Sequence, residues 1–512
     1  MSRLTTEVPA GRDSTSRRAA WTVAVPLGLA CVLILPLAIR NPMASTDEAW
    51  YASISRDIVD SGDWLTLHYN GEPWWEKPPL AIWGTAVAFQ CLGVWELPAR
   101  LVSVLSGLGA VAMVYAFMRR RGGAAAGMLA GFILLTAQDF LRFSAKGQLD
   151  VPLALLLSLQ LILFWWGRER PSLLLLSGVC MGLAVATKNQ AGLLGAGVAA
   201  VYMLAARDFG VLRRPQFYAG AALAAAVGLS WHVYQYAAYG NAFLEAFLDS
   251  NCSSAWTEWD RSTAFNHLKY LLERHNVLVA FASVGLVWAG WRYVKHRDRL
   301  ALFLAVWVAG MLGACLAWPR PQYWYLLPMY PGVALLSAGA ICRTGLWRRC
   351  QWAVLSAVAA WAVVFQITYH CPPPKEVELW AARRMAGDIQ AAVPSSQPVH
   401  LLVRPTPAGD VKEIHHPAAR FYFNRKILYA APEELRRMVA RGRPVFAAGH
   451  VDVLEEFYAP HVAGARIETL ARDGCYRCWQ IEPAADPKES AFPRPKWRHE
   501  RPAGPGDPEA RL

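Results

Sequence analysis

The segment from Trp21 to Ile39, WTVAVPLGLACVLILPLAI, carries no charge and is about as long as a helix that crosses the roughly 30 Å hydrocarbon layer of a membrane. Similar apolar runs recur along the first 370 positions of the 512-residue chain, separated by short polar or basic stretches. Apolar residues make up 55% of the chain and charged residues 17%, which is more apolar than soluble domains need. The sequence predicts an all-helical membrane protein with many spans and excludes collagenous, coiled-coil and disordered chains.

The net charge of +13 comes from basic residues that concentrate in alternate loops. Loops rich in Lys and Arg stay in the cytoplasm, so the excess indicates membrane topology and no nucleic-acid partner. This rule places the N-terminal segment 1–19 inside the cell and makes residues 20–370 the transmembrane domain. The loops expected on the outer face are 41–96, 140–149, 237–275, 318–322 and everything after 370.

The alternation of charged loops predicts about eleven spans in the transmembrane domain. They are expected to begin near residues 20, 97, 122, 151, 171, 190, 216, 276, 300, 323 and 352. Residues 77–93 are apolar but too short to cross comfortably, and a crossing there would break the charge alternation, so we expect an interfacial helix. The first run lacks a small-residue cleavage site and ends at Asn41-Pro42, so we expect it to be retained.

A second domain is predicted over residues 371–482, where the composition changes after a stiff linker at Pro372 to Pro374. Alternating segments there predict a small α/β domain outside the membrane. Its expected helices are 376–392 and 432–441, and its expected strands are 398–404 and 444–449. Residues 483–512 are rich in Pro and charge and predict a disordered tail.

Cysteine and histidine leave two questions open. Cys475 and Cys478 lie three positions apart in the outer domain, where a turn could let them form a disulfide, although two unpaired thiols are equally compatible with the spacing. A zinc site would need more ligands than that segment offers. His68, His232 and His267 could be metal ligands or proton carriers, but a plain hydrogen-bonded histidine is the more frequent case.

Ionisable residues gather in the expected outer loops. Asp47 and Glu48 follow the first span, Glu76 and Lys77 precede the expected interfacial helix, and Asp150 stands at the mouth of a span. Charged groups at such places tend to be functional. Ordinary alternatives exist for each: Asp47 or Asp150 could cap a helix, and Glu76 with Lys77 could be a solvated surface pair.

Several motifs in a fixed order give the chain a family resemblance. The motifs are Asp47-Glu48, Ser61-Gly62-Asp63-Trp64, Glu76-Lys77-Pro78-Pro79, Glu96 to Arg100, Ala186-Thr187-Lys188 and Tyr323 to Pro328. With them the chain resembles the integral-membrane glycosyltransferases that use polyprenyl-phosphate sugars. The resemblance is greatest to the aminoarabinose transferases that modify lipid A and weaker to protein O-mannosyltransferases. It covers roughly the first 340 residues.

The resemblance implies a fold of the GT-C type, with juxtamembrane helices in the first outer loop and a cavity at the periplasmic face of a bacterial inner membrane. It implies a polyprenyl-phosphate sugar as donor and a lipid or glycolipid acceptor, lipid A preferred. It assigns the catalytic role to carboxylates, namely Asp47, Glu48 and Asp150. It assigns donor or phosphate binding to Glu76, Lys77, Lys188 and Tyr325.

The expected chemistry suits these residue types. A sugar on a lipid phosphate has a good leaving group, provided that cations such as Lys77 and Lys188 stabilise the departing phosphate. A hydroxyl acceptor needs a base, which Asp47 or Asp150 could supply, and one in-line displacement inverts the sugar carbon. A phosphate acceptor needs no base, and the carboxylates would then orient substrates or hold a divalent metal ion.

A transporter or flippase for a lipid-linked solute is the alternative from another functional class. Such proteins place ionisable residues near the bilayer midplane and often contain paired repeats with broken helices. Here the acids cluster at one face, which favours surface chemistry. A ligand sensor would not require so many spans.

Overall fold

The computed structural model describes residues 12–43, 47–253, 269–273, 276–318, 322–368, 377–405 and 417–483. The chain divides into two compact units, Met1–Lys375 and Glu376–Leu512. Residues 484–512, which make up nearly all of the predicted tail, lie outside the described residues.

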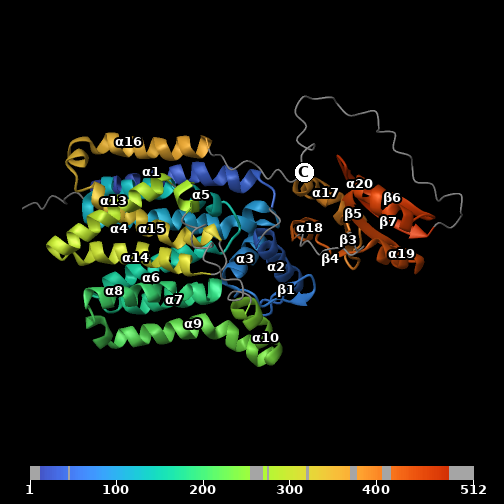
Figure 1. The fold of residues 1–512 in the computed structure, drawn as a ribbon, viewed down its shortest axis with the longest axis horizontal. Coiled ribbons are helices and arrows are strands. Elements are labelled where there is room, and N and C mark those ends of the chain that lie inside the picture. Colours follow the sequence, from blue (N-terminus) through green and yellow to red (C-terminus); the bar gives the residue numbers. More distant parts are fainter. Residues whose placement is uncertain are drawn as a thin grey trace, which may run out of the picture. The chain divides into compact units, whose positions relative to one another are not determined.

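The first unit is a helical bundle whose long helices lie roughly side by side (Figure 1). These helices are α1 (Arg12–Arg40), α4 (Glu96–Leu135), α6 (Asp150–Gly167), α7 (Leu173–Lys188), α8 (Leu194–Ala206), α9 (Pro215–Tyr239), α13 (Asn276–His296), α14 (Arg299–Ala317), α15 (Tyr330–Ile341) and α16 (Gly345–Thr368). Within the described ranges, 7 segments are long and apolar enough to cross a membrane. The predicted all-helical, multi-pass architecture is confirmed, whereas the count of about eleven spans stays a prediction.

The label α4 covers two of the expected separate elements. The spans predicted from residues 97 and 122 are the two arms of α4, and the chain turns between them where Gly123 has a φ of 79°. This left-handed conformation is readily adopted by glycine because it has no Cβ. The basic residues Arg119 to Arg121 lie at this turn, as the charges predicted. A Cβ on Gly127 would lie 2.8 Å from the carbonyl oxygen of Tyr115, so the two arms pack against each other.

Short elements fill the first loop of the bundle. They are α2 (Asp47–Ser61), the hairpin of β1 (His68–Tyr69) with β2 (Glu72–Pro73), and α3 (Leu80–Leu92). Asn70 and Gly71 join the two strands with φ values of 57° and 89°, as a two-residue hairpin turn requires. The helix predicted over residues 77–93 is α3, and its 13 residues are too few for a span. In Figure 1, α2, α3 and α10 (Asn241–Leu248) gather at one end of the bundle.

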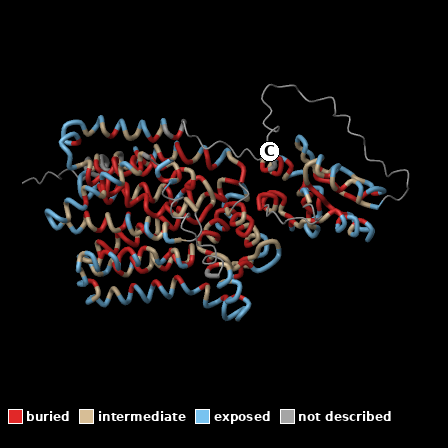
Figure 2. The backbone as a smooth tube through the Cα atoms, in the orientation of Figure 1, coloured by how far each residue is buried: buried red, intermediate tan, exposed pale blue. Residues whose placement is uncertain are grey.

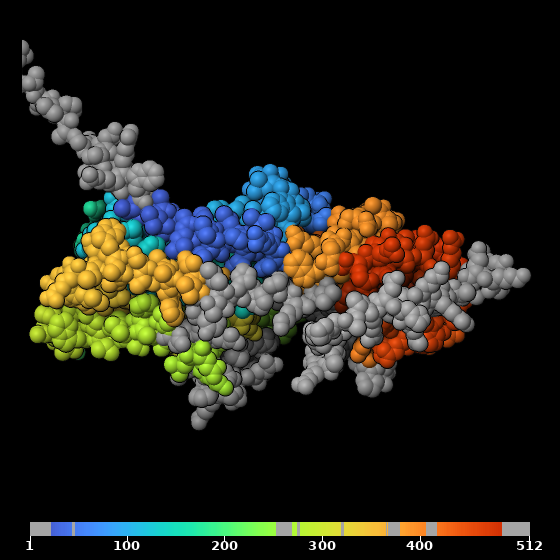
Figure 3. Space-filling model, turned by 90° about the horizontal axis from the view of Figure 1, so that it is seen from above, coloured from blue at the N-terminus to red at the C-terminus, as the bar shows by residue number. Residues whose placement is uncertain are grey.

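Packing in the bundle depends on close helix contacts and an apolar exterior. A Cβ on Gly178 of α7 would overlap the carbonyl oxygen of Gly220 of α9, so only glycine permits this approach. Figure 2 shows buried positions concentrated in the central helices and exposed ones along the outer faces of α9 and α16. In Figure 3, α1 and α16 both lie on the visible face. Apolar side chains of α16 such as Trp352 and Val364 are exposed. An apolar exterior of this kind suits contact with lipid.

The second unit is a small α/β domain, as predicted. Its five-stranded sheet has the order β4-β3-β5-β7-β6, in which β3 pairs in parallel with β4 and β5, and the remaining pairs are antiparallel. The strands are β3 (Val399–Leu402), β4 (Ile427–Tyr429), β5 (Val445–His450), β6 (Ala465–Asp473) and β7 (Tyr476–Pro483). The helices include α17 (Val377–Ala392), α18 (Pro417–Phe423) and α19 (Pro432–Ala440). The two helices and two strands predicted from the sequence correspond to α17, α19, β3 and β5.

Cys475 and Cys478 are both free thiols. Asp473 pairs with Tyr476 across the β6–β7 hairpin, so Cys475 lies in the turn and is exposed. Cys478 lies in β7 and is fully buried. The hairpin therefore separates the two sulfur atoms, and the alternative of unpaired thiols is the one that the structure adopts.

Candidate active site

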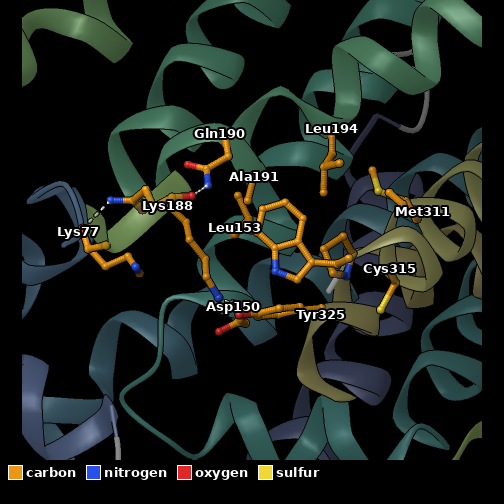
Figure 4. Close-up of a pocket in the computed structure, with 15 residues that line it drawn as sticks. Lys77, Asp150, Leu153, Lys188, Gln190, Ala191, Leu194, Met311, Cys315 and Tyr325 are labelled. Atoms are coloured by element: carbon orange, nitrogen blue, oxygen red, sulfur yellow. Dashed lines mark hydrogen bonds and ion pairs between the residues drawn. The ribbon is translucent and has the colours of Figure 1, made fainter. Parts of the chain in front are cut away.

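A cavity of about 200 Å³ opens among the helices of the first unit (Figure 4). Its polar wall comes from segments far apart in the sequence, and its apolar wall includes Leu153, Met311 and Cys315. The polar residues that line it are Lys77, Asp150, Lys188, Gln190, Ser250, Asn251 and Tyr325. Four of the seven sequence-predicted site residues therefore line one cavity, and they come from the first loop, α6, α7 and the 3-10 turn η4 (Tyr323–Met329).

Asp150 and Lys188 form the central ion pair of this wall. The Nζ atom of Lys188 lies 2.6 Å from Oδ1 of Asp150, and both side chains are largely buried. Asp150 begins α6 and Lys188 ends α7, so each charge has the sign that its helix terminus favours. The same Nζ lies 4.8 Å from the centre of the Tyr325 ring, a cation–π distance. Figure 4 shows the Lys188 side chain pointing toward Asp150 beside Tyr325.

Lys77 is electrostatically coupled to the predicted carboxylates. Burial lowers the pKa of Lys77, and Glu76, Asp47 and Asp150 oppose this shift, while Lys188 adds to it. The Nζ atom of Lys77 also donates to the backbone carbonyl of Glu76 at 3.2 Å. Three acids and two lysines therefore act on one another at this end of the bundle, although Asp47 and Glu76 are not part of the cavity wall.

Glu48 differs from its neighbour Asp47. Glu48 is 1% exposed, and its Oε1 accepts from Nε of Arg100 at 2.6 Å and from the backbone N–H of Gly147 at 3.0 Å. The other nitrogen atoms of Arg100 donate to the carbonyls of Ala38, Asn41 and Pro42, at the end of α1. These contacts tie α1, α2 and α4 together, and they fix the helix that carries Asp47.

Asn189 is a site residue that the sequence did not indicate. It directly follows Lys188, is 4% exposed and has a φ of 45°, which is uncommon outside glycine. Its Nδ2 donates to the backbone carbonyl of Glu76 at 3.0 Å and to Oδ1 of Asn251 at 2.9 Å. Its Oδ1 lies 3.1 Å from Nε2 of His232 on α9. Asn189 thus joins the segments that carry both lysines to two further helices.

Tyr51 is a second residue that sequence analysis missed. It lies four positions after Asp47 on α2, a spacing that places both residues on the same helix face and could have indicated it. Burial raises the pKa of Tyr51 well above its ordinary value, and the charges of Asp47, Asp150 and Glu76 raise it further. Its hydroxyl is therefore protonated at neutral pH and can donate a hydrogen bond.

The structure shows the surroundings of two of the three candidate histidines, His232 and His68. His232 is hydrogen-bonded to Asn189 and to the Gly228 carbonyl, and His68 lies 3.9 Å from Asp63. His267 is outside the described residues. Among the residues that the structure describes, no group of three or more His, Cys, Asp or Glu side chains could hold a metal ion.

Sequence comparisons match part of the chain to known proteins. The sequence profile of the dolichyl-phosphate-mannose-protein mannosyltransferase family matches residues 76–234. An uncharacterized protein of Aquifex aeolicus is 27% identical over 336 residues, which cover 64% of this chain and 65% of that protein. The undecaprenyl phosphate-alpha-4-amino-4-deoxy-L-arabinose arabinosyl transferase of Aeromonas salmonicida is 30% identical over 173 residues, covering 32% of this chain and 31% of that protein. The alignments thus span less than two thirds of these relatives.

The similarity to solved structures extends over both units. The crystal structure of ArnT from Cupriavidus metallidurans matches 91% of this chain and 98% of that chain, with a TM-score of 0.74 and 20% identity. The chain has the GT-C fold of ArnT. An oligosaccharyltransferase from Archaeoglobus fulgidus matches 86% of this chain and 69% of its own, with a TM-score of 0.50 and 13% identity. The predicted fold and the resemblance to the aminoarabinose transferases are therefore confirmed.

Proposed function

We propose that this protein is a glycosyltransferase that moves a sugar from a polyprenyl-phosphate donor to a lipid or glycolipid acceptor, with lipid A preferred. The observation that carries the proposal is the cavity in which Lys77, Lys188, Asp150 and Tyr325 meet, on a fold shared with ArnT. ArnT from Cupriavidus metallidurans has been solved bound to undecaprenyl phosphate, which supports a donor of this class. The names of several relatives support a sugar on that lipid.

The proposed reaction is a single displacement at the anomeric carbon. The acceptor oxygen attacks that carbon while the bond to the phosphate oxygen breaks, and the bonding electron pair leaves with the phosphate. Lys77 and Lys188 stabilise the charge that develops on the phosphate. Attack from the face opposite to the leaving group inverts the sugar carbon. No strong general acid is needed, because the polyprenyl phosphate leaves as an anion.

Asp47 is the carboxylate that we assign to the acceptor. It lies half-buried at the start of α2 and acts electrostatically on Lys77 and Tyr51. For a hydroxyl acceptor Asp47 takes the proton as the new bond forms, and for a phosphate acceptor it orients the substrate. Asp150 keeps Lys188 in place, and we assign to Glu48 a positioning role through Arg100.

The proposed location is a bacterial inner membrane, with the cavity at the periplasmic face and the N-terminus in the cytoplasm. The charge alternation of the loops supports this orientation. Asp47, Glu76 and Lys77 belong to a loop that this alternation assigns to the outer side, and Asp150 directly follows another such loop. The second unit would then also be periplasmic.

The experiment that tests the proposed function is sugar transfer by the purified full-length chain in lipid nanodiscs. The donor is an undecaprenyl-phosphate aminoarabinose and the acceptor is lipid A, with the product identified by mass spectrometry. Asp47→Asn should abolish transfer. Asp60→Asn, which alters an exposed carboxylate on the same helix, should leave transfer unchanged. Undiminished transfer by Asp47→Asn would remove Asp47 from the mechanism.

A protein acceptor is a second candidate, favoured by the match of residues 76–234 to the protein mannosyltransferase profile. Mass spectrometry of envelope lipids and envelope proteins, from cells with and without the gene, distinguishes the two. A sugar mass lost from a lipid supports the main proposal, and one lost from a protein supports this alternative.

A further inference from the structure

The second unit contains a hollow of about 480 Å³ that the proposed transfer reaction does not use. It lies where the parallel strands β3 and β5 begin and where α19 ends. Its wall includes Gln397, His400, Met438, Arg441, Arg443 and Phe446. The five-stranded sheet thus presents a concave, polar surface at the end where β3 and β5 begin.

The charge of this hollow is positive. Arg441 and Arg443 both line it and are exposed, and neither forms an ion pair with a carboxylate of the described ranges. Arg436, on the preceding helix α19, lies 3.8 Å from Glu433 and does not line the hollow. Two guanidinium groups that no described carboxylate pairs with, beside one concave surface, can form bidentate hydrogen bonds with a phosphate or a carboxylate.

His400 gives a second, independent indication of a ligand. It lines the hollow and is only 8% exposed, yet its Nδ1 has no hydrogen-bond partner in the part of the chain that the structure describes. Glu434 of α19 is the carboxylate that acts on the ring electrostatically. A buried polar atom without a partner costs free energy, and a ligand that reorients the ring can recover it.

We propose that this hollow binds a phosphorylated sugar. Two guanidinium groups match the double negative charge of a phosphate monoester. A carboxylate has a single negative charge and would pair with only one of the two guanidinium groups. The hollow is much larger than a phosphate ion, so part of the ligand lies beyond the anionic group. Met438 and Phe446 offer apolar surface to a sugar face, and the Gln397 amide can bond its hydroxyls. The proposal does not depend on the transferase function, because it concerns binding to another unit.

The test measures binding of α-glucose 1-phosphate to the full-length protein in nanodiscs by calorimetry. The double variant Arg441→Gln/Arg443→Gln should bind about tenfold or more weakly, the effect of losing charge-assisted hydrogen bonds. Arg436→Gln/Arg437→Gln removes the same charge from the preceding helix α19 and should bind like the wild type. Glucose and glucuronic acid should bind more weakly than the phosphate ester. An unchanged melting temperature of each variant would show that the fold persists.

Several outcomes would overturn the proposal. They are no binding by the wild type, equal loss in the two double variants, or an affinity for inorganic phosphate equal to that for the sugar phosphate. A second arm identifies the source of the ligand with nanodiscs that carry a phosphorylated glycolipid or its dephosphorylated form. Protection of Arg441 and Arg443 from chemical modification by the phosphorylated lipid alone would support a lipid head group. Protection by the soluble ester alone would support a free sugar phosphate, and protection by neither would overturn the site.

Discussion

The Nζ atom of Lys188 lies 2.6 Å from Oδ1 of Asp150, and each residue stands at a helix terminus that favours its charge. The two residues are separated by 38 positions in the sequence. Each side chain is largely buried, so either charge alone would lack compensation. The pair is therefore a structural element of the cavity as well as the proposed phosphate contact.

Removing one member of this pair should affect stability and transfer together. In Lys188→Met the buried Asp150 loses its partner, and we expect the free energy of unfolding to fall by about 3–5 kcal/mol. Transfer should fall by about 10²–10³-fold, because a cation that stabilises the leaving phosphate is gone. Asp150→Asn combined with Lys188→Met should restore most of the stability but not transfer. Thermal unfolding and mass-spectrometric product assays measure the two effects, and recovery of transfer in the double variant would contradict the assigned role.

Asp150 and Lys188 were both selected from the sequence, but their contact was not predicted. Asp150 stands at the mouth of a span, where a charge tends to be functional. Lys188 was selected because its motif resembles the polyprenyl-phosphate-sugar transferases. The helices of the bundle were predicted because their apolar runs have the length of a membrane span. The turn at Gly123 was predicted as well, because Arg119 to Arg121 mark a basic connection between two apolar runs.

Other features depend on contacts that no local pattern contains. Glu48 and Arg100 are 52 positions apart, so the sequence showed two adjacent acids and not that one of them is consumed by an ion pair. Asn189 acts through a left-handed backbone conformation and through contacts with Glu76, Asn251 and His232. Those contacts exist only once α7, α9 and the first loop have packed.

Loss of the charge of Glu48 should lower the stability of the protein, whereas loss of the charge of Asp47 should lower sugar transfer. Glu48→Gln leaves Arg100 buried without an anion and should lower the free energy of unfolding by about 3–5 kcal/mol. Asp47→Asn, one position earlier and half-buried, should change stability little while abolishing transfer. Thermal unfolding of the two variants and of Asp60→Asn makes the comparison. A stable Glu48→Gln variant would show that the ion pair does not hold α2 in place.

The ion pair of Glu48 with Arg100 predicts that the stability of the protein falls at low pH. Burial alone would raise the pKa of Glu48, but Arg100, with Lys146 and Gly147, outweighs it and holds the pKa below the ordinary value of 4.5. A depressed carboxyl pKa contributes stability that is complete above the unfolded value and is lost as the pH falls through the folded value. Wild-type protein should therefore lose stability below about pH 4.5 more steeply than Glu48→Gln. Unfolding followed between pH 3 and 7 measures this difference, and parallel curves would count against it.

Asn189 should act on transfer by positioning Lys188 and the segment that carries Lys77. Asn189→Gly permits the left-handed backbone but removes the contacts with Glu76, Asn251 and His232. We expect a moderate loss of stability, because buried hydrogen bonds are lost, and a loss of transfer of up to about 10²-fold, the effect of a small misplacement of reacting groups. Asn189→Ala should lose more stability, because alanine is also strained at a φ of 45°. Full transfer by the glycine variant would restrict Asn189 to a backbone role.

Lys77 should set the alkaline limit of transfer. Burial lowers the pKa of Lys77, so its positive charge is lost at a lower pH than that of an exposed lysine, despite the opposing carboxylates. Transfer should decline as the pH rises through this lowered pKa, since only the protonated amine stabilises the leaving phosphate. Lys77→Arg keeps its charge at every accessible pH and should extend activity toward higher pH, even if the maximal rate is smaller. Lys269→Arg alters an exposed lysine of the same bundle and should leave the pH profile of the wild type unchanged. An alkaline limb that stays in place in Lys77→Arg would assign it to another group, because arginine does not titrate in this range.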